Sequence, residues 1–417
     1  MKGIIKNYKQ RKNLIREKGL FSFLFSSSGY VLIIVLIITS LLVSATTEFI
    51  TVSQTSIGYM KKFNERVRAN FLARSGIDLC KFILRADRRG LKFEMLTGKP
   101  TNKNIDCYDD LWAINFPELP LEEGSLKIKI SDESSKINLS ILATEVVDKT
   151  PYYGIVQRFF MNMELPIDLA DIIIDWVDID DARFPYGAES SDYYQSLEKP
   201  YFAKNGCMDS IDELLLLKDF TPEIYYGLGG GNSETEAEEN LTEHNQGSTQ
   251  LDIEALLSFG QGGEEGDEGF NPLDNSAELD KILNSESEFE ETETVIGKEK
   301  SRALYNYFRV HGDRKNYLNQ VNKININTAP YRVIAALTEE MTDEIANEII
   351  RRRQNEPFKS TNELSEYIED ATVRRNLLTV RSSIFKLMAM ATVDDSTIKI
   401  VAIYNRDQKR FLYWSEE

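Results

Sequence analysis

The sequence is poor in the residues from which most active sites are built. Its 417 residues include two histidines, His244 and His311, which lie far apart in unlike surroundings. A histidine triad or a histidine-ligated metal site is therefore not expected. The sequence also lacks a phosphate-binding Gly-Lys-Ser/Thr loop and a Gly-x-Ser-x-Gly nucleophile elbow. We therefore expect that the protein is not an enzyme.

Cysteine is also scarce, with three residues: Cys80, Cys107 and Cys207. In an oxidising compartment one disulfide could form, and one thiol would be left over. The sequence does not say which pair would form.

Charged residues are missing between Lys18 and Glu48, and this gap determines how the rest of the chain is placed. From Tyr30 to Thr47 nearly every residue is Leu, Ile, Val, Ser, Thr or Ala, about the ~18 apolar positions that span a bilayer. Seven basic residues and one acid precede this run. The positive-inside rule then keeps the N-terminus cytoplasmic and exports the bulk of the chain.

Two ways of processing this segment are open. A secretory signal peptide would be cut after the apolar run, at the small residues Val43-Ser-Ala45, and would release a soluble exported protein. The alternative cut lies before the run, between Gly29 and Tyr30. A basic region of 29 residues is long for an ordinary signal peptide, which favours the second cut. That arrangement resembles the leader of type IV pilins and type II secretion pseudopilins.

The apolar run is predicted to continue as one long helix. Beyond Glu48 the chain has no proline as far as about Arg89, and apolar residues recur at three- and four-residue spacing at Met60, Phe63, Val67, Phe71, Leu79 and Phe82. A stem helix from Tyr30 to about Arg85 would lie half in lipid and half on a globular head. The alternative is a signal anchor followed by an unrelated helix.

Most of the net charge of −18 comes from one segment. Between Gly229 and Lys300 there are 20 Asp and Glu against three Lys, a net charge of −17, with ten of the 23 glycines. Such a composition cannot bury enough apolar surface to offset its ordering entropy. We expect a disordered acidic insert that acts as a solvated spacer; an acidic lure for a basic or cation-bearing partner is the alternative.

The remaining chain predicts an α+β fold. Leu126, Ile128 and Ile130 alternate with lysines as in a half-buried strand, and three further strands are predicted over 380–393, 397–404 and 409–414. Between Lys136 and Leu378 the pattern is mainly helical. The expected topology is a small antiparallel, pilin-like sheet packed on the stem helix, with an inserted all-helical domain.

The inserted domain contains two similar helical pieces. Helices are expected over 166–177 and 208–217 in the first piece, and over 325–337, 342–353 and 357–364 in the second. Thr328 and Thr342 are predicted to cap helix starts. The pattern resembles tandem helix-hairpin-helix or SAM-like units.

Helix-hairpin-helix units often grip nucleic-acid phosphates, for which they need a Gly-rich hairpin and a facing helix N-terminus. Here the hairpin 337–343 has no glycine and carries Glu339 and Glu340. Arg351, Arg352 and Arg353 form a basic patch, but consecutive helical residues point in different directions and read as a solvated face. We expect no nucleic-acid partner.

Acidic residues cluster after the first of these helices, at Asp171, Asp175, Asp178, Asp180, Asp181, Glu189 and Asp192. Carboxylates at this density repel one another unless a hard cation gathers them, and Ca²⁺ accepts six to eight oxygens in flexible geometry. The spacing is not that of an EF-hand, because Arg183 occupies the place that requires glycine. A solvated acidic loop is the alternative.

The order of several motifs resembles the minor pseudopilin K family of type II secretion systems, also named general secretion pathway protein K. The motifs are the leader ending at Gly29, Asp132–Leu139, Asp175–Asp181 with Gly187–Glu189, Ile211–Leu217 and Ile324–Pro330. The match covers most of the chain except the acidic insert, which is longer and more acidic than the family leads us to expect.

The resemblance implies cleavage by a prepilin peptidase at Gly29 and methylation of the new amine on Tyr30. Ordinary pilins carry a Glu at the fifth position after the cut, which neutralises a neighbour's ammonium within the membrane; here that position is Ile34. A subunit without this acid cannot join in the usual way beneath another, because a buried unpaired charge is costly. The resemblance therefore implies a place at the tip of the pseudopilus.

The implied role is to nucleate or cap the periplasmic pseudopilus, which drives folded proteins through the outer membrane. Expected partners are the minor pseudopilins I and J, with the outer-membrane secretin or secreted substrates as further candidates. The protein would be a single-pass inner-membrane protein of a Gram-negative bacterium. In the family the helical domain binds calcium, and the candidate ligands here are Asp178, Asp180, Asp181, Glu189 and Asp192, with Asp175 second.

The expected organisation is a cleaved leader (1–29), the stem helix (30–90), a first part of the pilin-like domain (91–135), a first SAM-like unit with the acidic loop (136–228), the acidic insert (229–300), a second SAM-like unit (301–378) and the C-terminal strands (379–417).

Two other functions stay open: an exported helix-hairpin-helix protein that binds DNA in a DNA-uptake or type IV pilus machine, and a secreted calcium-binding protein.

Overall fold

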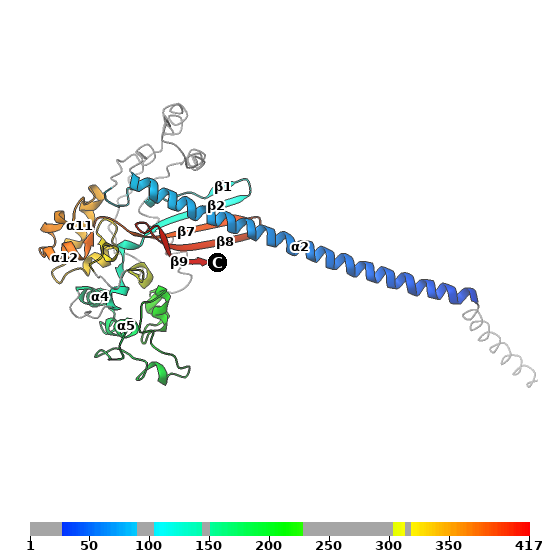
Figure 1. The fold of residues 1–417 in the computed structure, drawn as a ribbon, viewed down its shortest axis with the longest axis horizontal. Coiled ribbons are helices and arrows are strands. Elements are labelled where there is room, and N and C mark those ends of the chain that lie inside the picture. Colours follow the sequence, from blue (N-terminus) through cyan, green and yellow to red (C-terminus); the bar gives the residue numbers. More distant parts are fainter. Residues whose placement is uncertain (1–26, 90–103, 144–150, 228–302, 313–317) are drawn as a thin grey trace, which may run out of the picture. The chain divides into compact units, whose positions relative to one another are not determined.

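The computed structural model describes residues 27–89, 104–143, 151–227, 303–312 and 318–417 (Figure 1). The chain divides into two compact units, Met1–Arg68 with Asp394–Ser396, and Ala69–Val393 with Thr397–Glu417. The predicted acidic insert (229–300) lies outside the described residues, as does the predicted leader except for its last three positions.

The first unit contains most of one long helix, α2 (Ser27–Arg89), which includes the whole stem helix predicted from Tyr30 to about Arg85. From Tyr30 onward α2 is long and apolar enough to cross a membrane, and its most apolar stretch is not buried by other parts of the protein. The hydroxyls of Thr46, Thr47 and Thr51 donate to the carbonyls four residues earlier at 2.8–2.9 Å. These polar groups are therefore satisfied within the helix itself.

The second unit is built on a five-stranded sheet in the order β1-β2-β7-β8-β9. Its strands are β1 (Leu119–Leu121), β2 (Gly124–Asp132), β7 (Ile384–Val393), β8 (Ser396–Asn405) and β9 (Arg410–Glu416), and the pairs β1–β2, β2–β7 and β8–β9 are antiparallel. The strand around Leu126 and the three C-terminal strands were predicted, and the α+β class is confirmed. The first C-terminal strand begins at Ile384, not Val380, because the preceding residues bind the 104–110 segment.

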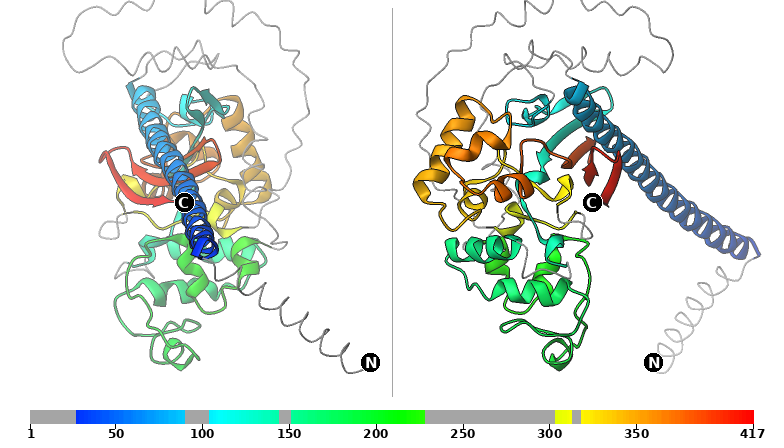
Figure 2. Two further views of the ribbon diagram at one scale, coloured as in Figure 1. Left: turned by 90° about the vertical axis from the view of Figure 1, so that its right-hand side faces the viewer. Right: turned by 60° about the vertical axis from the view of Figure 1, so that its left-hand side comes forward.

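The part of α2 that belongs to the second unit packs on one face of this sheet, as two views show (Figure 2). Leu126 and Ile128 of β2 and Ala73 of α2 belong to the same core. Gly76 allows a close approach: a Cβ there would lie 2.8 Å from Leu126 Cδ1 and 2.9 Å from Ala389 Cβ. The absence of a side chain at Gly76 therefore lets the helix lie directly on the strands.

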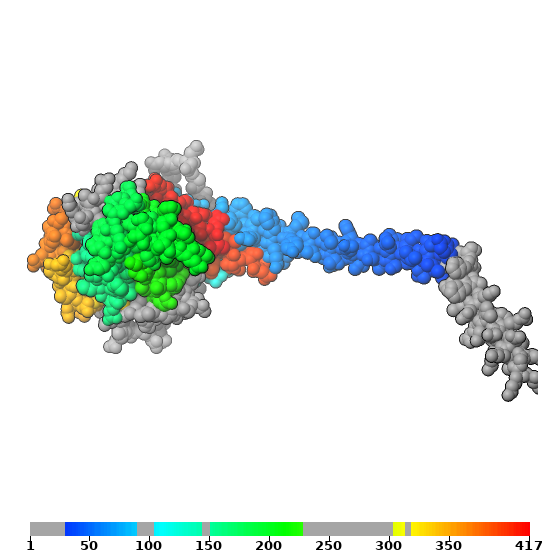
Figure 3. Space-filling view, turned by 90° about the horizontal axis from the view of Figure 1, so that it is seen from below, coloured from blue at the N-terminus to red at the C-terminus, as the bar shows by residue number. Residues whose placement is uncertain are grey.

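The chain between β2 and β7 forms a helical module, whose first half faces the viewer in green in Figure 3. In the described part of the module the α-helices are α4 (Pro151–Asn162), α5 (Leu169–Val177), α6 (Pro222–Tyr226), α10 (Tyr331–Ala335), α11 (Asp343–Asn355) and α12 (Ala371–Asn376). The expectation of helices was incomplete, because two short parallel strand pairs also occur: β3 (Ile137–Asn138) with β4 (Phe308–Arg309), and β5 (Ile324–Asn325) with β6 (Leu378–Thr379).

The module has two halves that follow the same course. Each begins with a capped 3-10 turn, in which Asp132 accepts from the Ser134 N–H in the first half and Asn319 accepts from the Val321 N–H in the second. A lysine and an Ile-Asn strand follow in both, and then two α-helices, a Ser-capped 3-10 helix, a short α-helix and the closing strand. The two similar pieces seen in the sequence are thus longer than predicted and include the Ile-Asn strands.

Two local predictions for this module need correction. The stretches 208–217 and 357–364 form 3-10 helices, Ile211–Leu216 and Thr361–Glu366, where helices had been expected. Thr342 does cap α11 by accepting from the Ile345 N–H, but Thr328 caps no helix, because α10 starts after Pro330. The three cysteines are free thiols, so the described residues contain no disulfide.

Candidate cation site and domain joint

The acidic loop is an insertion into the first half of the module. In the second half a short connection joins α11, which ends at Asn355, to the 3-10 helix that begins at Thr361. In the first half the corresponding connection runs from Asp178, after α5, to Ser210. Asp171 and Asp175 lie on α5, which belongs to the repeated framework, and the other predicted acidic residues lie in this longer connection.

Two aspartates of α5 hold the loop against the helix. The buried Asp171 accepts from the Tyr153 hydroxyl (2.6 Å) and the Tyr186 N–H (3.2 Å), which occupies both of its oxygens. Asp175 is also buried, and its Oδ1 accepts from the Phe184 N–H at 3.0 Å. Gly187 is required beside it, because a Cβ there would lie 1.9 Å from Asp175 Oδ2. The loop therefore closes tightly over the Asp175 carboxylate.

Four buried oxygens in this region have no hydrogen-bond partner: Asp175 Oδ2, Asp178 Oδ1, Glu189 Oε1 and Asn205 Oδ1. Buried polar atoms are nearly always satisfied in folded proteins, so four such oxygens in one loop need an explanation. The set contains oxygen atoms alone, which are the ligands that Ca²⁺ prefers. The chemistry of these donors therefore fits a hard cation.

The electrostatics of the three carboxylates agree with this reading. Burial raises the pKa of Asp175 to about 6, and it raises the pKa values of Asp178 and Glu189 to about 7. Neighbouring carboxylates, including Asp181 for both Asp178 and Glu189, add to these shifts. A nearby cation would favour the charged forms and oppose these shifts.

The other predicted ligands have identifiable partners in the loop. Asp180 accepts from the Ala182 N–H at 2.8 Å, and Asp181 accepts from Asn205 Nδ2 at 3.0 Å. Asp192 accepts from the Glu189 N–H at 2.8 Å and forms an ion pair with Arg183 at 2.9 Å. Sequence reasoning missed Asn205, whose left-handed backbone (φ 46°) and following glycine mark a turn.

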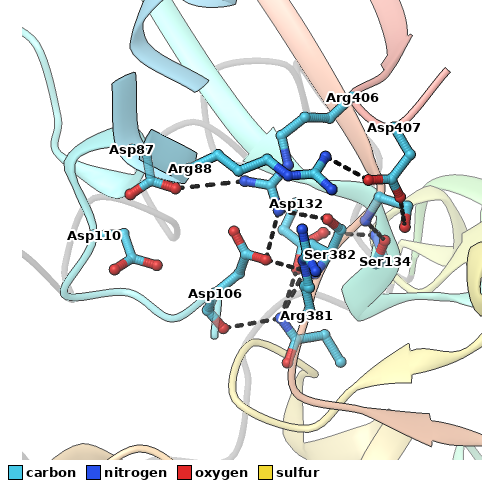
Figure 4. A network of polar contacts seen from close by, with 12 residues as sticks. Asp87, Arg88, Asp106, Asp110, Asp132, Ser134, Arg381, Ser382, Arg406 and Asp407 are labelled. Atoms are coloured by element: carbon cyan, nitrogen blue, oxygen red, sulfur yellow. Dashed lines mark hydrogen bonds and ion pairs between the residues drawn. The ribbon is translucent and has the colours of Figure 1, made fainter. Parts of the chain in front are cut away.

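A second polar centre joins the sheet to the helical module (Figure 4). Asp132, at the end of β2, is buried and accepts from the hydroxyls of Ser382 and Thr328, each at 2.5 Å, and from the Ser134 N–H at 2.7 Å. Asn325 of β5 lies 3.4 Å from the same carboxylate and also donates to the Asp106 carbonyl at 2.9 Å. The role of Thr328 is therefore to connect the module to the sheet.

Two ion pairs, which we term the clasp, attach the end of α2 to the β8–β9 turn: Asp87–Arg406 (3.4 Å) and Arg88–Asp407 (2.5 Å). The helix supplies the acid in the first pair and the base in the second. The first pair is buried and the second is half-exposed. Arg406 also bonds Asp106 at 2.6 Å, and its guanidinium lies 4.8 Å from the centroid of the Phe385 ring. The clasp thus connects helix, sheet and the 104–110 segment.

Among the described residues, one group of three carboxylates has ligand atoms that all lie within 4.8 Å of one another, and it is found beside the clasp and not in the acidic loop. Its members are Asp87, Asp106 and Asp110. Burial and, after it, the neighbouring carboxylates raise the pKa of Asp87 to about 7 and that of Asp110 to about 8. No sequence pattern pointed to this group, because its members belong to no motif.

The basic patch of α11 is largely used within the fold. Arg353 donates to the carbonyls of Ile326 and Ala329 at 2.6 and 2.7 Å. Arg352 lies 3.6 and 3.7 Å from two carboxylates, those of Glu356 and Glu363. Two of the three arginines of the patch therefore have partners within the fold, whereas Arg351 is exposed.

The two halves of the clasp make a matched test. We expect Arg406→Met to lower the free energy of unfolding by about 3–5 kcal/mol, because it leaves buried carboxylates without their counter-charge. Arg88→Met removes the half-exposed pair and should cost about 0–1 kcal/mol. Denaturant unfolding of the detergent-solubilised chain measures both values, and equal losses would contradict the dominance of Arg406.

The helical module is similar to parts of known proteins. Residues 135–229 and 324–381 each match a family model described as type II secretion system protein K; the first range covers the first half of the module apart from its closing strand β4, and the second covers most of the second half. The type II secretion system protein K of Aeromonas hydrophila is 30% identical over 128 residues, which cover 27% of this chain and 38% of the relative. The aligned region therefore spans well under half of that relative.

A solved structure shares the fold. A chain of the GspK–GspI–GspJ complex from the type 2 secretion system of enterotoxigenic Escherichia coli superimposes with a TM-score of 0.51 and 13% identity, covering 88% of this chain and 99% of that one. At this identity the likeness concerns the fold alone. Both halves of the helical module are thus similar to the family described as type II secretion system protein K.

Proposed function

We propose that this chain is the protein K type of minor pseudopilin, which nucleates or caps the tip of the periplasmic pseudopilus and so helps to export folded proteins across the outer membrane. One observation carries the proposal: a chain with both halves of the protein K module also contains an apolar helix whose far end packs on a five-stranded sheet. The role is structural, and no catalytic residue is assigned.

The apolar part of α2 would anchor the protein in the inner membrane as a single span, with the basic N-terminal segment in the cytoplasm and the second unit in the periplasm. A prepilin peptidase would cut between Gly29 and Tyr30, and the new amine of Tyr30 would be methylated. Ile34 stands where ordinary pilins carry an acid, which supports a place at the tip and not within the shaft.

The mature N-terminus tests this processing. We expect intact-mass analysis of the protein purified from membranes to show a chain that starts at a methylated Tyr30, because the apolar helix must stay attached to serve as a stem. A chain that starts at Thr46 and is found in the soluble exported fraction would instead support a secreted protein.

The proposed partners are the minor pseudopilins I and J. The similar solved chain comes from a complex of these three types of subunit. In this chain, side chains of α2 beyond the predicted span are strongly exposed although they are apolar, among them Ile57, Met60, Phe63 and Phe71. Large apolar side chains left in solvent at helical spacing are typical of a surface that packs on other helices. The secretin and secreted substrates are further candidates that the described residues do not distinguish.

Replacement of single side chains tests the stem surface. We expect Phe63→Asp to reduce the amount of I and J that co-purifies with this chain about tenfold or more, because the lost apolar burial is worth ~1.5–3 kcal/mol. Lys62→Asp, an exposed change on the next residue, is the matched control and should leave recovery unchanged. Equal recovery with both variants would contradict packing through this face.

We also propose that the acidic loop binds calcium. The candidate ligands are those predicted from the sequence, Asp175, Asp178, Asp180, Asp181, Glu189 and Asp192. The four unpartnered oxygens favour Asp175, Asp178, Glu189 and the additional Asn205 among them. A bound Ca²⁺ would neutralise the carboxylates and hold the loop against α5. We further propose that the two halves of the module are SAM-like or helix-hairpin-helix units. A role in binding DNA is not favoured.

Calcium binding predicts a rise in melting temperature. At a concentration one hundred times the dissociation constant, Ca²⁺ should stabilise the fold by about 2.7 kcal/mol relative to EDTA. Asp178→Asn should reduce this response, whereas Glu198→Gln, a change at an exposed acid of the same loop, should retain it. If the melting temperature is the same in Ca²⁺ and EDTA, the loop is a solvated acidic segment.

A further inference from the structure

The carboxylates beside the clasp outnumber their counter-charges. Asp87, Asp106 and Asp110 are each at most 5% exposed, and their ligand atoms lie within 4.8 Å of one another. The guanidinium of Arg406 bonds Asp87 and Asp106, while Asp110 Oδ2 accepts from the Cys107 N–H at 2.8 Å. Three carboxyl groups therefore share the field of one buried guanidinium (Figure 4).

Among the residues that the structure describes, the surrounding elements do not supply the missing positive charge. Arg88 of α2 forms its ion pair with Asp407 of the β8–β9 turn at 2.5 Å, so these two charges offset each other. The 104–110 segment adds Asp109 and the Cys107 thiol, and β2 adds the buried Asp132. The nearby groups that can change charge are thus mostly acidic, and burial penalises each additional negative charge.

We propose that Asp87 and Asp110 retain a proton from the solvent in the folded protein and that this proton makes the clasp sensitive to pH. With the proton bound, one carboxyl group is neutral, and Arg406 can balance much of the remaining charge. When the proton leaves as the pH rises, the added repulsion pushes the last turn of α2 and the 104–110 segment apart. The attachment of the stem helix to the sheet is then tight in mildly acidic and neutral solution and looser in alkaline solution.

The direction of the pH effect follows from the raised pKa values. Both carboxyls bind a proton more strongly in the folded chain than the ordinary Asp value of 3.8. Their contribution to stability is fully present below the unfolded value, declines as pH rises above it, and is lost once pH passes the folded values of about 7 and about 8. One retained proton changes the unfolding constant about tenfold per pH unit within this window.

The test compares the full chain with two variants in detergent with EDTA. Asp110→Asn keeps the shape of the side chain but removes its titration. Between about pH 5 and about pH 8 the unfolding constant of this variant should therefore rise less steeply than that of the parent chain, by a factor of up to tenfold per pH unit. Asp78→Asn changes an exposed acid of α2, the helix that carries Asp87, and should leave the dependence of stability on pH unchanged. Infrared spectra at neutral pH should show a protonated carboxyl band that Asp110→Asn removes and Asp78→Asn retains.

Hydrogen exchange measures the clasp directly. The amides of Ile83–Arg89 in the full chain should exchange faster above about pH 8 than their intrinsic rates require, and Asp110→Asn should remove this excess. The proposal is overturned if the infrared band is absent and the slopes of Asp110→Asn and the parent chain agree. It is also overturned if added Ca²⁺ restores alkaline stability only when Asp110 is present, because a cation would then neutralise the group. Neither result bears on whether the chain serves in the pseudopilus.

Discussion

The structure of the second unit depends on the burial of one guanidinium. Arg406 brings together a carboxylate from the end of the long helix and one from the segment that follows it, and it lies over an aromatic ring of β7. Buried ion pairs contribute little net stability compared with apolar contacts, but the loss of one partner is expensive. Such a centre chiefly favours one arrangement of its elements, because the end of the helix and the β8–β9 turn must lie close enough for their charges to pair.

Next to this centre, Asp132 connects the sheet to the helical module. The hydroxyls of Ser382 and Thr328 point at its carboxylate from the start of β7 and from the second half of the module. A polar network of this kind is costly when partly satisfied and rigid when complete. Because Asp132 also caps the first 3-10 turn of the module, sheet and module share one side chain at their boundary.

The two halves of the module show where function can be added to a repeated framework. Both halves use the same capped turns and Ile-Asn strands, which keep their helices in register. The first half alone contains the long acidic connection, with buried oxygens that have no partner within the loop. The loop therefore has a feature that packing within the loop does not explain, and the proposal of a bound cation rests on it.

The sequence by itself determined the parts of this protein that depend on neighbouring residues. The uncharged run, its basic flank, the alternation in β2 and the caps such as Thr342 are local patterns, and each has a direct physical meaning over a few residues. The acidic loop was also visible, because its carboxylates are close in sequence. The true function of Thr328, the unpartnered oxygen of Asn205 and the carboxyl group beside Arg406 were decided by tertiary structure alone. Thr328 and Arg406 meet partners far away in the chain, 319 residues in the case of Arg406 and Asp87, and burial makes an unsatisfied polar group such as the Asn205 oxygen costly.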